Sequence, residues 1–265
     1  FKECVSGDPN GRYADYFIWS DSISNNDKEQ IALRNKEANP QASTRGKWVE
    51  LDAKRGKYYQ KNYYVCQPAL NYGYANPDPA KPWEQSVNAP GPQAVRRELR
   101  NIMAFWFDKG VDGFRVDMAA SLVKGDPDKK AVMALWQEMR EWINKNYPEC
   151  VLVSEWSDPK KSIPAGFNID FEIHLADKIY NTLFFASDAP WGKKGKECYF
   201  DKNGRGSLDY FYSKYADIYS STHDKGYVAF PTANHDFQRL RTGRRNDLQQ
   251  LKVAMTFFLT MPGVP

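Results

Sequence analysis

The sequence predicts an α/β fold built on a parallel sheet, on three observations. From about residue 92 onward, apolar residues at helical spacing alternate with short strand patterns. Charged side chains gather where several of these strand patterns end. The 265 residues are 42% hydrophobic and 15% aromatic, which is enough to bury the core of a barrel-sized domain. Strands that alternate with helices in this way are typical of parallel α/β sheets.

Each predicted element from residue 92 onward has its own signal. Helices are predicted around residues 95–106, 132–143, 208–219 and 248–258, and Gly110 supplies a stop after the first. Strands are predicted at residues 111–117, 150–155 and 227–234, with a weaker candidate at 169–173. Residues 1–90 lack long periodic segments and are rich in Tyr, Trp, Asn, Gly and Pro. We expect them to form an irregular excursion with a poor core of its own, packed on the α/β part at residues 91–265.

Charge and composition exclude several classes of protein. The 37 basic and 33 acidic residues leave a net charge of +4, and the basic residues are scattered, which predicts a solvated surface and no nucleic-acid partner. No apolar run reaches the roughly 18 residues of a membrane span. The four cysteines are far apart and lack CxxC spacing, so neither a zinc site nor a dense disulfide framework is predicted. The sequence indicates no compartment, and cytoplasmic and secreted locations both stay open.

Residue alternation places acidic groups on one face of the sheet. In the strand at 111–117, Arg115 and Asp117 share a face, and the other face is apolar. The outer face of an α/β barrel packs on helices, so we expect this pair to point to the interior and the top rim. The same alternation places Glu155 there, and Asp236 closes a third strand. A private ion pair between Arg115 and Asp117 is the alternative, but it does not explain the shared register of Glu155 and Asp236.

Three carboxylates with an Arg and a His at one rim suit the cleavage of a glycosidic bond. That reaction needs one ionised carboxylate at the sugar centre and one protonated carboxyl for the leaving oxygen. Arg115 would keep Asp117 ionised, and the clustered negative charge would raise the pKa of Glu155.

Three short motifs resemble those of glycoside hydrolase family 13, the α-amylase family. They are Gly113 to Asp117 (GFRVD), Ser154 to Trp156 (SEW) and Asn234 to Asp236 (NHD). Two further stretches add to the resemblance, which covers the whole chain. Gln67–Asn71 looks like the return of that family's domain B to the barrel, and Met261–Pro265 like the start of its eighth strand. The resemblance implies the second half of a (β/α)8 TIM barrel, about strands 4 to 8, with an inserted irregular domain B at residues 1–90.

Carried over position by position, the resemblance implies a role for each motif residue. Asp117 is the implied nucleophile, Glu155 the acid/base and Asp236 the transition-state stabiliser. Implied sugar-binding residues are Arg115, Asn234, His235 and Arg239, although Arg239 also fits an ordinary surface residue. No cofactor is expected. Met118 to Ala120 lack the Lys-His of many calcium-dependent amylases, so a structural calcium ion is not indicated. The sequence departs from the family pattern in two other ways. Ser154 stands where the family usually has Gly, and the first conserved motif of the family is absent.

The resemblance implies a retaining glycoside hydrolase that acts on α-glucosidic bonds of starch-derived glucans or oligosaccharides through a covalent glycosyl-enzyme. A transglycosylase or isomerase of the same family, like trehalose synthase or sucrose phosphorylase, is the alternative. A catalytically inactive amylase-like binding module is a remoter alternative. Such modules lose the catalytic carboxylates, whereas this sequence retains Asp117, Glu155 and Asp236. Linkage preference, endo or exo action and oligomeric state stay open. We also expect these residues to be a segment of a longer enzyme that is insoluble or inactive alone, because a half-barrel exposes strand edges.

Overall fold

The computed structural model describes the chain except residues 172–181, 184–197, 202–206, 236–238 and 243–244. Two compact units result: Phe1–Lys109 with Ser121–Ala131, and Gly110–Ala120 with Val132–Pro265. The first unit carries a small antiparallel sheet, and the second carries a parallel one. The domain boundary predicted at residue 90 stays a prediction.

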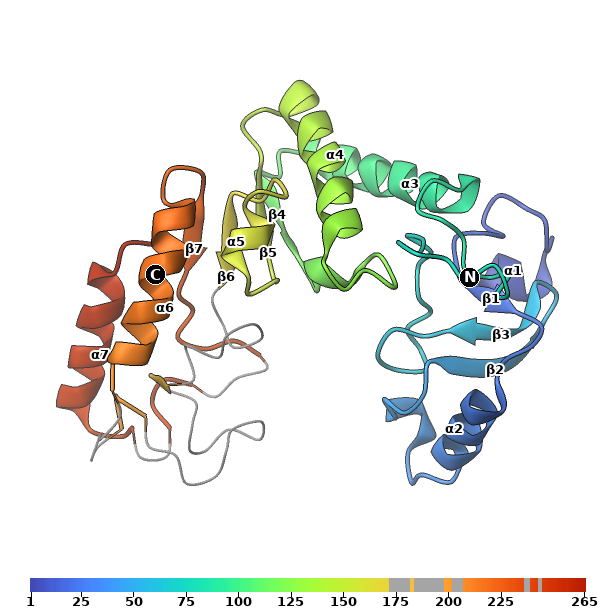
Figure 1. Ribbon diagram of the computed structural model, residues 1–265, viewed down its shortest axis with the longest axis horizontal. Coiled ribbons are helices and arrows are strands. Elements are labelled where there is room, and N and C mark those ends of the chain that lie inside the picture. Colours follow the sequence, from blue (N-terminus) through green and yellow to red (C-terminus); the bar gives the residue numbers. More distant parts are fainter. Residues whose placement is uncertain (172–181, 184–197, 202–206, 236–238, 243–244) are drawn as a thin grey trace. The chain divides into compact units, whose positions relative to one another are not determined.

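The second unit is built on a parallel sheet of four strands (Figure 1). In sheet order they are β4 (Gly113–Val116), β5 (Val151–Ser154), β6 (Ile169–Phe171) and β7 (Tyr227–Ala229). Beyond β7, Val264 pairs in parallel with Ala229, where the sequence indicated the start of a further strand. Each adjacent pair is parallel, so the predicted α/β fold with a parallel sheet is confirmed.

The four predicted helices are also present. They are α3 (Pro90–Phe107), α4 (Lys130–Asn146), α6 (Asp209–Thr222) and α7 (Leu248–Thr260), with the short helices η2 (Ala119–Ser121) and α5 (Pro159–Ser162) between them. Gly110, which follows α3, has the left-handed φ of +87° expected of a stop residue. The apolar face of α4 is fully buried, and Phe211 of α6 packs in one cluster with Phe258 of α7. No helix within the described residues is long and apolar enough to cross a membrane.

A glycine sets the closest approach of two strands. Gly113 of β4 pairs with Val151 of β5, and a Cβ added to Gly113 would overlap the carbonyl oxygen of Val151. A backbone oxygen held in a sheet cannot rotate away as a side chain can. Only glycine therefore lets β4 lie this close to β5. The pairing of Gly113 with Val151 also sets the register of the residues that follow on the two strands.

The first unit contains an antiparallel sheet in the order β1-β3-β2. Its strands are β1 (Trp19–Ser20), β2 (Trp48–Ala53) and β3 (Gly56–Gln60). The helices of this unit are α1 (Lys2–Ser6), α2 (Asn25–Asn35), η1 (Pro40–Ala42) and also α3. Successive residues of a strand point to opposite faces of the sheet, and here each face carries a cluster of buried side chains. Trp48 and Tyr58 pack in one cluster with Ile31 of α2, whereas Val49 and Tyr59 pack in another with Cys4 of α1. Tyr58 and Tyr59 thus each contribute to a buried cluster, one on each face of the sheet, which is more core than residues 1–90 were expected to have.

Replacing Gly113 by Ala should destabilise the whole protein more than replacing Gly110 by Ala. Nothing lies within 4 Å of a Cβ added at Gly110, so that change costs only the strain of a positive φ, about 1–2 kcal/mol. At Gly113 the added methyl must push β4 away from β5 or strain the backbone. Thermal denaturation of both variants measures the difference. A melting temperature for Gly113→Ala equal to or above that of Gly110→Ala would contradict the close pairing.

Candidate active site

The register of β4 and β5 brings two acidic residues to the same end of the sheet. Arg115 pairs with Val153 and Val116 with Ser154, so Asp117 and Glu155 follow their strands at the same level. The backbone N–H of Glu155 donates to the carbonyl of Val116 at 3.0 Å, which continues the ladder by one residue. The shared strand-end register that alternation predicted for these two residues is therefore present in the fold.

Arg115 joins the two acidic side chains. Its Nη1 lies 2.6 Å from Oδ1 of Asp117, and its Nη2 lies 2.6 Å from Oε1 of Glu155. A planar guanidinium can hold two carboxylates at once in fixed directions, which an ammonium cannot. The alternative of a private pair between Arg115 and Asp117 is therefore wrong, because Glu155 shares the same guanidinium.

The two carboxylates differ in their access to solvent. The side chain of Asp117 is 71% exposed, whereas that of Glu155 is 10% exposed. The residue after Asp117 also contacts Glu155. Met118 has a left-handed φ of +47°, and its backbone N–H donates to Oε2 of Glu155 at 3.2 Å. Both oxygens of Glu155 are thus held, one by Arg115 and the other by a backbone amide.

Burial raises the pKa of the Glu155 carboxyl above its usual value. A hydrogen bond with Asp117 raises this pKa further, and the amide of Met118 and the charge of Arg115 act in the opposite direction. Clustered negative charge was the expected cause of the raised pKa of Glu155, but burial is the larger one. A carboxyl whose pKa is raised keeps its proton to higher pH than an ordinary glutamate, which suits a general acid.

Ser154 and Asp170 form a contact that was not predicted from the sequence. The Ser154 hydroxyl lies on the face of β5 opposite to Glu155 and donates to Oδ1 of Asp170 at 2.5 Å. Asp170, in β6, is fully buried. The available signal was a lone acidic residue inside the apolar stretch from Phe167 to Phe171, which is rare unless the carboxylate is paired.

The remaining predicted residues follow β7, which lies two strands from β5 in the sheet. Asn234 is half-buried, and His235 and Arg239 are exposed. Asp236 lies outside the described residues. The roles of these four residues stay predictions. Within the described part of the chain, no group of three or more His, Cys, Asp or Glu side chains gathers as a metal site requires, and the expectation about calcium also stays a prediction.

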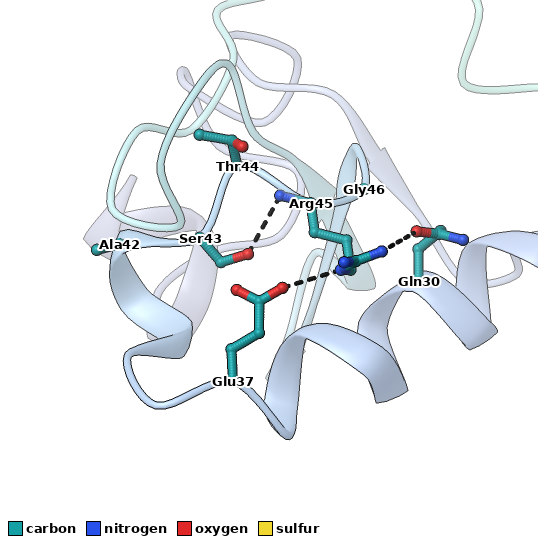
Figure 2. Close-up of a pocket in the computed structure, with 7 residues that line it drawn as sticks. All are labelled: Gln30, Glu37, Ala42, Ser43, Thr44, Arg45 and Gly46. Carbon is teal, nitrogen blue, oxygen red and sulfur yellow. Dashed lines mark hydrogen bonds and ion pairs between the residues drawn. The ribbon is translucent and has the colours of Figure 1, made fainter. Parts of the chain in front are cut away.

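A pocket of about 530 Å³ lies in the first unit, away from these strand ends in the sequence (Figure 2). Its lining residues are Gln30, Glu37, Ala42, Ser43, Thr44, Arg45 and Gly46. Figure 2 shows Arg45 between Glu37, at 2.9 Å, and Gln30, at 3.5 Å. The one cation in the lining is thus already paired with the one carboxylate. The pocket holds neither two carboxylates nor a nucleophile with its base, so we assign no chemistry to it.

Comparison with known proteins gives a consistent result over the whole chain. The family described as "Alpha amylase, catalytic domain" matches residues 1–265. Alpha-amylase 3 of Dictyoglomus thermophilum is 26% identical over 263 residues, which cover 97% of this chain and 40% of that protein. Trehalose synthase/amylase TreS of Mycolicibacterium smegmatis is 23% identical over 291 residues, with 97% of this chain and 43% of that protein covered. The chain thus spans less than half the length of these two relatives.

Among solved structures, a mutant of the trehalulose synthase MutB is similar with a TM-score of 0.62 and 19% identity. The match covers 99% of this chain and 44% of that one. At this identity the likeness concerns the fold. The parallel sheet and its helices are accordingly part of a (β/α)8 barrel, as the sequence predicted.

Two substitutions should shift the pKa of Glu155 in opposite directions. Arg115→Met removes a cation that lowers this pKa, so the pKa should rise. Asp117→Asn removes a negative charge that raises it, so the pKa should fall. Titration of ¹³C-labelled glutamate carboxyls by NMR in the whole protein measures both shifts, with Glu155→Gln to assign the signal and Arg115→Lys as the charge-conserving control. Shifts of the same sign in both variants would contradict the bridged arrangement.

Proposed function

Because the chain belongs to the alpha-amylase catalytic-domain family, we propose that the whole protein cleaves α-glucosidic bonds with retention of configuration. One observation of the structure supports this most directly. A single guanidinium holds two carboxylates, one exposed and one buried, at the carboxyl ends of adjacent parallel strands. Enzymes with this fold carry their chemistry at that end of the barrel.

In the first half of the reaction, Asp117 acts as the nucleophile. Its exposed carboxylate is accessible to a sugar, and the ion pair with Arg115 at 2.6 Å holds it in place. Glu155, whose pKa is raised by burial, donates its proton to the leaving glycosidic oxygen. The bond from the anomeric carbon to that oxygen breaks as the bond to Asp117 forms, which gives a covalent glycosyl-enzyme.

In the second half, Glu155 acts as a base and removes a proton from the incoming nucleophile, whose oxygen displaces Asp117. Two inversions at the anomeric carbon restore the α configuration. Water gives hydrolysis, and a sugar hydroxyl gives transfer from the same intermediate. Names among the relatives include both amylase and trehalose synthase, which keeps transfer as the second candidate. Products from maltose separate the two, since hydrolysis yields glucose and isomerisation yields a disaccharide.

The rest of the proposed site comes from the segment after β7. Asp236 would stabilise the positive charge that develops at the sugar, as the third carboxylate. Asn234, His235 and Arg239 would bind sugar hydroxyls together with Arg115. Each proposal follows from the motif position of the residue. The substrate class is an α-glucan or α-linked oligosaccharide, and the proposed mechanism uses no cofactor.

The role of Glu155 can be tested through the leaving group. Glu155→Gln in the whole protein should lower kcat/KM for ordinary α-glucosides by about 10²- to 10⁴-fold, because an amide cannot supply the proton. Hydrolysis of α-glucosyl fluoride should lose less in the glycosylation step, since fluoride leaves without a proton. Azide should restore turnover by forming α-glucosyl azide. Equal losses on both substrates, or a β-configured azide product, would contradict the assignment.

A further inference from the structure

The backbone turn that follows Glu155 is organised around a buried carboxylate. Asp170 lies in β6 beside Ser154 and is 0% exposed. Besides the Ser154 hydroxyl, its Oδ1 accepts from the N–H groups of Trp156, at 3.1 Å, and Ser157, at 3.3 Å. Its Oδ2 accepts from the N–H of Asp158 at 2.9 Å. These four donors come from both sides of Glu155 in the sequence, one before it and three after it.

Three successive amides reach one carboxylate only in an unusual backbone conformation. Ser157 supplies it with a left-handed φ of +57°, which costs a non-glycine residue about 1–2 kcal/mol. Successive N–H groups in a turn of this kind can form a concave row that binds an anion. Here the anion is a side chain of the neighbouring strand, and it offsets the strain at Ser157.

Asp170 is suited to this task at neutral pH. Burial raises its pKa to about 6, and the hydrogen bonds from Ser154 and the amides of Trp156 and Asp158 act in the opposite direction. At pH 7 the carboxyl is therefore mostly ionised and can accept from all its donors. Because its side chain is on the far face of the sheet from Glu155 and fully buried, it cannot touch a substrate.

We propose that Asp170 is a positioning residue for Glu155, and that it holds the acid/base against Arg115 by fixing the turn from Ser154 to Asp158. This inference rests on the proposed function for its effect on catalysis. The residues on both sides of Glu155 are held by Asp170, Ser154 through its hydroxyl and Trp156 through its backbone N–H. The side chain of Glu155 therefore leaves the strand in one direction, toward the guanidinium. Ser154, which stands where the family usually has glycine, adds a donor to Asp170 that glycine cannot supply.

The test is Asp170→Asn in the whole protein, compared with Asp201→Asn. Asp201 is also a buried carboxylate of the second unit, 2% exposed, but it pairs with Arg245 at 3.2 Å. The Asp170 variant should lose about 100-fold in kcat/KM on ordinary α-glucosides, as expected for a displaced catalytic group, and much less on α-glucosyl fluoride. The Asp201 variant should lose similar amounts on both substrates. A uniform loss in the Asp170 variant would overturn the proposal.

A crystal structure of Asp170→Asn gives a second readout that does not depend on activity. In that structure Glu155 should have moved away from Arg115, and an unchanged contact of 2.6 Å would overturn the positioning role. This result does not depend on whether the wild-type protein cleaves a glucoside. A wild-type protein that cleaves none would overturn the proposed function instead. If Asp170→Asn does not fold, Ser154→Ala removes one donor only. It should shift the same ratio of the two substrates in the same direction to a smaller extent, and an unchanged ratio would again overturn the proposal.

Discussion

The parallel pairing of β4 with β5 is the constraint on which the site depends. Gly113 allows the two backbones to approach, and the register that follows places Arg115 opposite Val153. Asp117 and Glu155 then meet because each is the residue after its strand. Two carboxylates this close repel one another, and Arg115 offsets that repulsion by binding both. The backbone thus creates the juxtaposition, and one side chain makes it stable.

Two acids can serve opposite roles only if their surroundings differ. Exposure provides most of that difference, since Asp117 is open to solvent and Glu155 is largely buried. The left-handed residues Met118 and Ser157 stand within two positions of these acids. Strained backbone of this kind persists where surrounding contacts determine it strongly. Met118 turns its amide onto Glu155, and Ser157 turns its amide onto Asp170. These left-handed residues therefore fix the turns beside the two acids, and the amide that Met118 provides lowers the pKa of Glu155 against the effect of burial.

Most of the correct predictions of helices and strands came from the periodicity of apolar residues in the sequence. Helical spacing and strand alternation are local properties, so they gave the order of elements in the second unit and the common face of Arg115, Asp117 and Glu155. Asp170 was missed because its partners are mainly backbone amides of another strand, which leave no pattern in the sequence. The hairpin of β2 and β3 turns through Lys54 and Arg55, which lack the Asn-Gly or Asp-Gly signal of such turns. Helix α2 had a signal, since Ser24 caps it by accepting from the amide of Asp27.

The central claim is that Asp117 becomes covalently bound to the sugar while Glu155 moves the proton. Incubation of the whole protein with a slow fluorinated α-glucosyl fluoride should accumulate the intermediate, because fluorine on the sugar slows its hydrolysis. Mass spectrometry of peptides then identifies the labelled residue. We expect one glycosyl group per chain on the peptide that contains Asp117, and none in Asp117→Asn. Label on Glu155 or Asp236, or steady turnover without a covalent adduct, would contradict it.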